Sequence, residues 1–470
     1  MRQREKIQEL LHESIVGDLT LNFMLRTLLA TLLDALYGCA LAVAFPLLAY
    51  RRWRQGKSWN DWATKLTGKV EIDVPCAFRI WMHAVSVGEV NLLVGFVRAL
   101  EARHPDLDVV ISSSTSTGLQ LARERFGAER VFPFPYDFSW GIREAFRRIE
   151  PQMILLAELE LWPNMIAVAW QAEVPVGVIN GRMSDASFRG YRRLRWLLRG
   201  TFARLAWVAV QDDTYRDRFH AMGVPLDRIQ VTGSLKFDYA PDSRDCPDVR
   251  VVRVTLGTSA ENSIWLAGST QEGEEEVVIK IYRKLSPRFP HLRLMLVPRH
   301  AERFEEVARL VESNRLRVVR YSQLRSPRDR WAGDEVVLGD QMGQLRTWWG
   351  IAEIAFVGGS LGDRGGQNML EPAGYGAAVC FGPNTRNFRQ IVERLLAVDG
   401  ARMVRDAEEL EAFITHMLDQ PAVAISMGER ARNLVRAQQG ATTRTLDLIT
   451  KTLPSPSTPN HSENHSEDRH

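Results

Sequence analysis

The sequence predicts an α/β protein with two doubly wound parallel sheets and an N-terminal membrane-anchor helix. Short β-rich runs alternate with amphipathic helical stretches, which is the pattern of parallel sheets covered by helices. A polar stretch at 239–254 interrupts this alternation once, and a second series follows it. An apolar segment precedes both series. The 470 residues, 45% of them hydrophobic, suffice for two or three domains with sizeable cores.

Composition excludes several classes of protein. Sixty Lys and Arg against 57 Asp and Glu give a net charge of +3, too balanced to indicate nucleic acid as the partner. The four cysteines are far apart and form no C-x-x-C pair, so neither a disulfide framework nor a zinc site is indicated. A reducing, cytosolic setting fits this usage.

Residues 25–52 form the predicted membrane anchor. The cleanest apolar run, 35–50, is followed at once by a basic cluster, whereas a cleaved signal peptide has its basic residues first. Arg26 and Asp34 interrupt the apolar segment, so a short span and an interfacial helix are both compatible with it. A buried core helix is the third interpretation. The positive-inside rule places the body of the chain in the cytoplasm. No role is assigned to the extension 1–24.

Two Rossmann-like domains are expected, at 70–240 and 258–452, followed by a disordered tail at 453–470. Ligands of doubly wound sheets gather at the carboxyl ends of the strands, so a cleft between the domains is the expected active site. The strands of the first domain are expected at 108–114, 153–159, 174–180 and 206–211. Those of the second are expected at 263–269, 292–298, 335–340, 353–360 and 377–382.

The segment "IWMHAVSVGEV", residues 80–90, is interpreted as a strand, a tight turn at Gly88 and a helix that begins at Glu89. Ser86 and Glu89 have the spacing of a capping box, so Glu89 could serve only to satisfy helix amides. The alternative is a general base, which needs an ionised carboxylate within hydrogen-bond reach of an acceptor hydroxyl.

Carboxylates also end a buried strand in "ILLAELELWPN", at Glu158 and Glu160. Acidic residues seldom end a buried strand without a purpose. They could act in catalysis, or they could form a structural pair with Arg182.

The second domain carries a glycine-rich loop, "FVGGSLGDRGGQNMLEPAGYG", between a strand and a helix start near Asn368. Glycines and free amides there would suit an anion. Glu371 could cap that helix with Asn368 or bind a ribose diol. Arg299, at another strand end, could pair with a phosphate. No metal site is predicted, because the one D-x-D sequence, Asp106 to Asp108, precedes a strand.

Seven segments, in order, resemble the bacterial 3-deoxy-D-manno-octulosonic acid (Kdo) transferases that act on lipid A precursors. The likeness runs from about residue 32 to 448, with the apolar anchor and "RQGK" ahead of the seven segments. They are "HAVSVGE", "ELELWPN", "GSLKFD", "VPRHAERF", "FVGGSL", "GGQNMLEPA" and "FGPNTRNF".

The resemblance implies a GT-B fold and inverting transfer of Kdo from CMP-Kdo to a lipid A precursor, without a cofactor, at the cytoplasmic face of the cell inner membrane. It implies that Glu89 is the general base and Glu158 a second catalytic carboxylate. The CMP-binding residues that it implies are Pro298, Arg299, Met342, Gly343, Gln344, Asn368, Met369, Leu370 and Glu371.

The chain departs from the family's pattern at four positions. The family usually has histidine where this chain has Gln271, Gln367 and Asn384, and glutamate where it has Gln344. These departures bear on donor binding and leave the base intact. Two alternative functions remain: a GT-B transferase or epimerase that uses another nucleotide sugar, and an inactive membrane-bound binder of the same fold.

Overall fold

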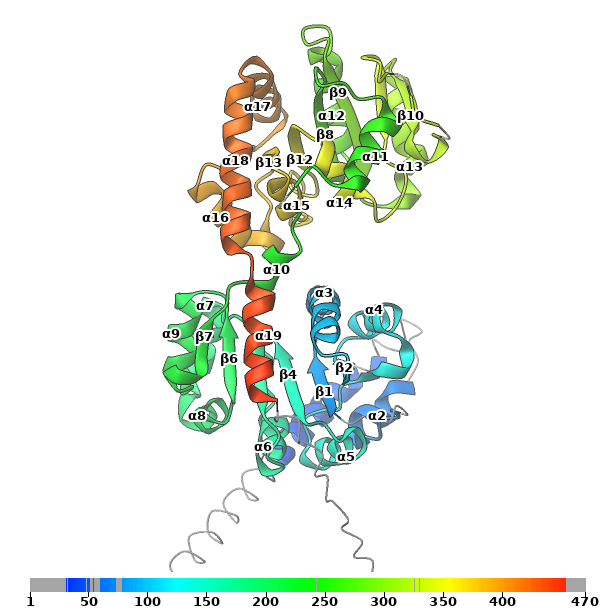
Figure 1. Cartoon of the computed structure of the whole chain (residues 1–470). Helices are drawn as coiled ribbons and strands as arrows, with labels where there is room; N and C mark the ends of the chain where they lie inside the picture. The colour runs from blue at the N-terminus through cyan, green and yellow to red at the C-terminus, as the bar shows by residue number, and fades with distance from the viewer. Residues whose placement is uncertain are drawn as a thin grey trace, which may run out of the picture. The chain divides into compact units, whose positions relative to one another are not determined.

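Two parallel sheets of seven strands organise the chain, one in each of two structural units (Figure 1). The computed structural model describes residues 31–453 apart from positions 32, 48, 51–53, 55–59, 73–77, 242, 325 and 329. Unit 1 comprises the chain up to Leu235 and again from Gly440, and unit 2 comprises Lys236–Gln439. The predicted extension 1–24 and the tail from position 454 lie outside the described residues.

The sheet of unit 1 has the strand order β3-β2-β1-β4-β5-β6-β7, with every pair parallel. Its strands are β1 (Phe78–His83), β2 (Leu107–Ser113), β3 (Val131–Pro133), β4 (Met153–Ala157), β5 (Val176–Gly181), β6 (Trp207–Val210) and β7 (Ile229–Val231). Its helices include α2 (Asn60–Thr67), α3 (Val87–Arg103), α4 (Ser116–Phe126), α5 (Ser139–Ile149), α6 (Pro163–Gln171), α7 (Asp185–Arg193), α8 (Arg195–Ala203), α9 (Asp213–Met222) and α19 (Ala441–Thr452).

The sheet of unit 2 has the order β10-β11-β9-β8-β12-β13-β14, again parallel throughout. Its strands are β8 (Ser263–Thr270), β9 (Leu292–Pro298), β10 (Arg317–Arg320), β11 (Glu335–Leu338), β12 (Ile354–Val357), β13 (Ala378–Phe381) and β14 (Ala401–Met403). Its helices include α11 (Pro247–Leu256), α12 (Glu274–Leu285), α13 (Phe304–Ser313), α14 (Leu345–Trp348), α15 (Leu370–Gly374), α16 (Arg389–Ala397), α17 (Ala407–Asp419) and α18 (Pro421–Gln438), and the short α10 (Leu235–Asp238) leads into the unit.

Both faces of the second sheet are buried. Along β8, Ile264 and Leu266 belong to one hydrophobic cluster, while Trp265 and Ala267 belong to another. Because helices cover both faces, the strands are continuous apolar runs rather than alternating ones. The predicted α/β fold with two doubly wound sheets is therefore confirmed.

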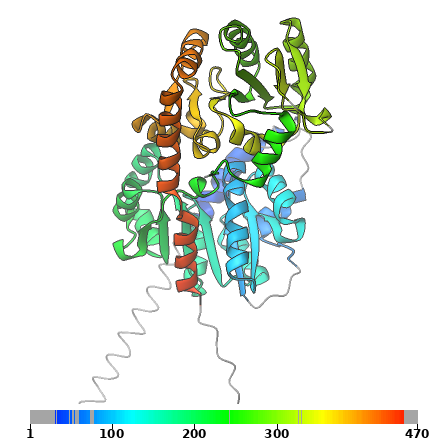
Figure 2. The ribbon, with the colours of Figure 1, turned by 45° about the horizontal axis from the view of Figure 1, so that its top comes forward.

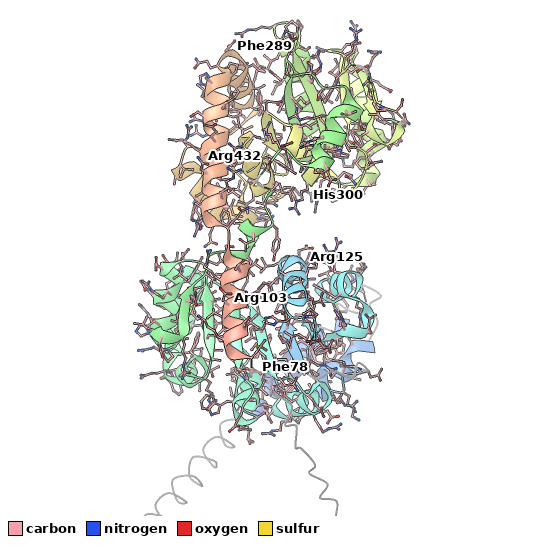
Figure 3. The ribbon with its side chains drawn as sticks, in the orientation of Figure 1. Phe78, Arg103, Arg125, Phe289, His300 and Arg432 are labelled. Atoms are coloured by element: carbon pink, nitrogen blue, oxygen red, sulfur yellow. The ribbon has the colours of Figure 1, made fainter. Side chains whose placement is uncertain are left out.

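The last helix belongs to the first unit. α19 packs along α3, where Arg103 forms an ion pair with Asp447 at 2.7 Å and the His104 ring lies 2.9 Å from the Thr450 hydroxyl (Figures 2 and 3). The expected second domain, 258–452, differs from unit 2 at both ends, because unit 2 includes α11 and ends before α19. Sequence alternation did not distinguish a final helix that returns to the first sheet from one that stays on the second.

The segment predicted as a membrane anchor is helical over 33–47 and docks on unit 1 through Asp34. The Asp34 carboxylate accepts hydrogen bonds from the Ser139 amide and hydroxyl, at 2.8 and 2.6 Å, and from the Asn164 side chain at 3.1 Å. Leu36, Val43 and Leu47 are exposed. No helix among the described residues is both long and apolar enough to cross a membrane.

The D-x-D sequence has a structural explanation. Asp108 lies near the start of β2 and its carboxylate pairs with Arg79 of β1 at 2.8 Å, with both side chains buried. Arg79 also donates a hydrogen bond to the Ile149 carbonyl. This pair ties two central strands to the helix α5 at the amino edge of the sheet.

We expect Asp108→Ala to destabilise unit 1 by about 3–5 kcal/mol, since it leaves the Arg79 guanidinium buried without its counter-charge. Asp106→Ala is the matched control within the same motif, because Asp106 is exposed, and it should change stability by less than about 0.5 kcal/mol. Urea unfolding measures both. Equal effects of the two substitutions would contradict this assignment.

Candidate active site

In each sheet the strand order reverses once, so the connections that follow two neighbouring central strands run toward opposite edges of the sheet. In unit 1 this switch point lies between β1 and β4, and in unit 2 it lies between β8 and β12. Ligands of doubly wound sheets bind outside the carboxyl ends of the strands at such points. The loops that follow β1, β4, β8 and β12 are therefore where ligand-binding residues are expected.

Glu89 lies at the switch point of unit 1, in the first turn of α3. The turn after β1 ends at Ser86 and Gly88 is already helical, so the helix begins at Val87, two residues before the predicted start at Glu89. The Ser86 hydroxyl donates to one oxygen of Glu89 at 2.7 Å, and the Val85 amide donates to the other at 2.8 Å. The Ser86 hydroxyl also accepts from the Glu89 amide at 3.5 Å, so the N-cap half of the predicted capping box is present, while the carboxylate accepts from the Val85 amide rather than from that of Ser86.

Capping leaves Glu89 with the electrostatics of a base. The residue is 8% exposed, and burial raises the pKa of its carboxyl above the usual range. The hydrogen bonds from Val85 and Ser86 oppose this rise, Glu158 adds to it, and Arg182 opposes it. A carboxylate whose pKa lies nearer neutrality is a stronger proton acceptor than an ordinary one.

Glu158, directly after β4, has a left-handed backbone with a φ of +60°. Non-glycine residues adopt this conformation rarely, and it occurs often at active sites. The Arg182 guanidinium, just after β5, donates to the Glu158 carboxylate at 2.6 Å. The ion pair considered as the structural alternative is therefore present, and it lies at the same edge as Glu89.

Glu160 is the third acid of this cluster. Burial, followed by the charges of Glu89 and Glu158, raises the pKa of Glu160 to about 8. Its carboxyl is therefore mostly protonated at pH 7 and can donate a hydrogen bond. The sequence showed Glu160 as a strand-end carboxylate but gave no sign that it differs from Glu158 in charge.

A pocket of about 210 Å³ lies at the switch point of unit 2. Typical ligand pockets enclose ~300–1,000 Å³, so this one accommodates part of a nucleotide sugar. It includes six of the nine residues that the resemblance implied for CMP, which are Pro298, Arg299, Met342, Gly343, Asn368 and Glu371.

The other three do not line the pocket. Gln344 is exposed at the start of α14, while Met369 and Leu370 are buried in the hydrophobic core. Asn368 uses its side-chain oxygen to accept from the Leu370 amide at 3.1 Å, and its amide group lies 3.2 Å from Glu371. The N-cap residue of α15 is Met369 and has no side-chain cap, so Asn368 lines the pocket and accepts from an amide of the first turn without being the cap itself.

Two arginines and one acid give the pocket its charge. Arg299 follows β9, and Arg346 belongs to α14. Burial raises the pKa of the Glu371 carboxyl, while the charges of Arg346 and Arg299 and a hydrogen bond from Asn368 oppose that rise. The pocket therefore has a net positive charge that suits an anionic ligand. Arg346 was missed in the sequence, where it lies outside every family motif.

The glycine-rich loop after β12 is not a free anion site. The buried Glu274 carboxylate accepts hydrogen bonds from the amides of Gly359, Ser360 and Leu361, at 2.7, 3.0 and 3.0 Å. It accepts a fourth from the Gln271 amide at 2.9 Å. An anion already occupies these donors, and it belongs to the protein. The expectation that these amides would hold a phosphate is wrong for this part of the loop.

The three amide residues that replace the family's histidines lie around this loop. A Cβ placed on Gly359 would be 3.4 Å from the Gln367 side chain and 3.6 Å from that of Gln271. The Asn384 amide donates to the Ser360 carbonyl at 3.0 Å. Of the three, Gln367 lines the pocket at the switch point of unit 2.

Comparisons with known proteins agree with these observations. A family model described as "3-Deoxy-D-manno-octulosonic-acid transferase (kdotransferase)" matches residues 52–239. The 3-deoxy-D-manno-octulosonic acid transferase of Bordetella pertussis is 33% identical over 434 residues, covering 88% of this chain and 98% of that protein. The corresponding enzyme of Haemophilus influenzae is 32% identical over 373 residues, covering 79% and 86%.

Among solved structures, the UDP-GlcNAc 2-epimerase of Neisseria meningitidis shares the fold, with a TM-score of 0.53 and 11% identity over 80% of this chain and all of that one. The resemblance inferred from the seven motifs is confirmed by the two transferases, which match this chain along most of its length. The chain therefore belongs to the 3-deoxy-D-manno-octulosonic acid (Kdo) transferase family of glycosyltransferases.

Proposed function

We propose that this protein transfers Kdo from CMP-Kdo to a hydroxyl of a lipid A precursor in lipopolysaccharide core biosynthesis, with inversion at the anomeric carbon. The observation that carries the proposal is the position of Glu89. In a chain of this family, it is a buried carboxylate with a raised pKa, fixed at the switch point of the acceptor-side sheet.

In the proposed step the acceptor hydroxyl attacks the anomeric carbon of Kdo and gives its proton to Glu89. The bond from that carbon to the phosphate oxygen of CMP breaks, and CMP leaves with the electron pair. The Val85 amide and the Ser86 hydroxyl hold the carboxylate in place, so little reorganisation accompanies proton transfer. Glu158, oriented by Arg182, is the second catalytic carboxylate of the proposal.

Unit 2 supplies the charge that the leaving group needs. CMP-Kdo carries a phosphate and a sugar carboxylate, and charge-assisted hydrogen bonds from arginine to such groups are strong. Arg299 and Arg346 are the cations that line the pocket, and Glu371 is placed to accept from ribose hydroxyls. Transfer needs both units, because the base lies in one and the donor pocket in the other.

We also propose that the helix at 33–47 rests on the cytoplasmic face of the cell inner membrane. Asp34 fixes one side of this helix to unit 1, and the exposed Leu36, Val43 and Leu47 are available to lipid. An interfacial helix buries its apolar face at the headgroup boundary without spanning the bilayer. This placement would bring the protein to a lipid-embedded acceptor.

A transferase or epimerase for another nucleotide sugar is the second candidate, because the fold is shared with a UDP-GlcNAc epimerase and four donor-side positions depart from the family's pattern. The melting temperature with CMP, UDP or GDP separates the two. A shift with CMP alone supports the first proposal, and a shift with UDP or GDP alone contradicts it.

We expect Glu89→Gln to lower the rate of Kdo transfer by ~10²–10⁴, which is typical for loss of a general base, while CMP binding in unit 2 is unchanged. The measurement is turnover of CMP-Kdo with a lipid A precursor, followed by mass spectrometry. Ser86→Ala removes one of the two donors that hold the carboxylate but leaves the carboxylate itself, so it should lower the rate less than Glu89→Gln does. Near-normal turnover in the glutamine variant would exclude Glu89 as the base.

The pH dependence of this reaction follows from the direction of the Glu89 shift. The base acts when ionised, so kcat/KM should fall as pH falls through its pKa. Because burial raises that pKa, the fall should be centred above the ~4.3 of an ordinary glutamate. An acid limb centred at or below that ordinary value would contradict the buried environment described for Glu89.

Arg346→Gln and Arg299→Gln should each weaken CMP binding by about ten- to a hundred-fold, since a hydrogen bond to a charged group contributes ~1.5–3 kcal/mol. Titration calorimetry with CMP measures this effect. Arg389→Gln, at an exposed position on α16, is the control and should leave the affinity unchanged. If Arg346→Gln behaves like this control, Arg346 lines the pocket without contacting the donor.

A further inference from the structure

The helices α7 and α8 form a strongly basic pair that the proposed reaction does not use. They meet at Leu194, which ends one helix and precedes the other. The stretch 186–204 contains six arginines and no aspartate or glutamate. In the rest of the chain acids and bases are nearly balanced, so this concentration of one sign is specific to the helix pair.

The junction of the two helices has exposed apolar side chains among its arginines. Its sequence is Arg-Arg-Leu-Arg-Trp, residues 192–196, and all five side chains are exposed. Leu194 is 49% exposed and Trp196 is 80% exposed. The packing of the pair onto unit 1 uses other residues, among them the fully buried Phe202, which contacts Tyr191 and Phe219. The junction is therefore not needed for the hydrophobic core.

The helix pair borders the carboxylates of unit 1. Arg182, which pairs with Glu158, comes three residues before α7. Within α7, Tyr191 lies close enough to Glu160 for that charge to raise the pKa of the phenol, after the larger effect of burial. A surface bound at α7 and α8 would therefore lie next to the acceptor side of the proposed reaction.

The same pair adjoins the helix at 33–47. Thr201 and Arg204, at the end of α8, line a small pocket together with Leu33 of that helix and Trp170 of α6. Trp170 is itself half exposed. Exposed apolar residues of the helix at 33–47 and the basic junction thus belong to neighbouring parts of one unit.

We propose that the α7–α8 junction docks unit 1 on an anionic lipid surface. Arginines 189, 192, 193, 195 and 199 would bind headgroup phosphates, and Leu194 and Trp196 would enter the interface. Arginine clusters are attracted to anionic bilayers, and tryptophan with its apolar body and N–H group favours the interface. An exposed leucine and tryptophan side by side among arginines combine an apolar surface with positive charge, as an anionic lipid interface requires, so lipid is the partner that the residues favour. The inference rests on the proposed function for its purpose, since a lipid-embedded acceptor requires access from a membrane.

The test uses the full chain and vesicles of phosphatidylcholine with or without phosphatidylglycerol, measured by co-sedimentation. The principal variant is R189Q/R192Q/R193Q/R195Q, and the second is Trp196→Ser. The matched control, R283Q/R309Q/R364Q/R402Q, removes the same charge from exposed positions of unit 2. A normal melting shift with CMP and an unchanged circular dichroism spectrum show that each variant is folded.

We expect the principal variant to bind phosphatidylglycerol vesicles at least tenfold more weakly than the unmodified chain, with a reduced dependence on salt. Trp196→Ser should weaken binding several-fold and leave the salt dependence unchanged, and the control should change binding less than twofold. Equal binding by the principal variant and the unmodified chain, or an equal loss in the control, would overturn the proposal. Binding of an RNA oligonucleotide that displaces the vesicles at micromolar concentration would also overturn it.

Turnover separates this inference from the proposed function. The principal variant should lose transfer to an acceptor embedded in phosphatidylglycerol vesicles and keep transfer to a deacylated, water-soluble acceptor. If no chain transfers Kdo to either acceptor, the proposed function fails while the vesicle result still decides the docking surface. If transfer to both acceptors is normal in the variant and vesicle binding is unchanged, the docking surface fails and the proposed function stands.

Discussion

The donor side of this protein depends on the carboxylate of Glu274. Two oxygens of one buried side chain accept four backbone hydrogen bonds, three from the loop after β12 and one from the loop after β8. The two loops approach so closely that a Cβ on Gly358 would lie 2.6 Å from the Thr270 Cα. The close approach of the two loops therefore requires both glycine at position 358 and the Glu274 carboxylate that accepts from their amides.

This arrangement limits which groups of unit 2 are free to bind a ligand at its switch point. In phosphate-binding loops, free amides at a helix start supply the positive charge. Here the amides of 359–361 are neutralised from within, so recognition of the donor passes to the side chains around them. Gln367 and Asn368 follow the loop that Glu274 holds, and the arginines reach the pocket from β9 and α14. Side chains, unlike backbone amides, change with the sequence, and Gln367 is one of the side chains that line this pocket.

The charged side chains at the two switch points differ in their predominant sign, and each sign suits the role proposed for its unit. Unit 1 has three carboxyl groups and one arginine near the end of β4, as deprotonation of an acceptor requires. Unit 2 has two arginines and one carboxylate, as an anionic donor requires. An acid cluster in unit 2 would repel an anionic ligand, whereas in unit 1 burial, followed by repulsion from neighbouring carboxylates, raises the pKa values of Glu89 and Glu160.

Sequence patterns predicted the central strands and the residues that directly follow them. Buried strands are continuous apolar runs, so the central strands of both sheets and the carboxylates after β1 and β4 were identifiable. The edge strands β3, β7, β10 and β14 were missed, because they have only three or four residues and some are partly exposed. Arg346 and Glu274 were missed for another reason. The sequence gives the position of each residue in the chain, but it does not show which distant loop or pocket its side chain contacts. Family motifs located six pocket residues, but included Met369 and Leu370, whose positions in the motif reflect the core.

The return of α19 to unit 1 bears on the order in which the protein matures on the ribosome. Unit 2 is one continuous stretch and is fully synthesised before α19 emerges. Unit 1 is synthesised first but completed last. Arg103 and His104, at the end of α3, can form their contacts only after Asp447 and Thr450 have been synthesised. α3 is the helix whose first turn holds Glu89. During translation unit 2 is therefore complete before the helix that carries Glu89 has all of its contacts.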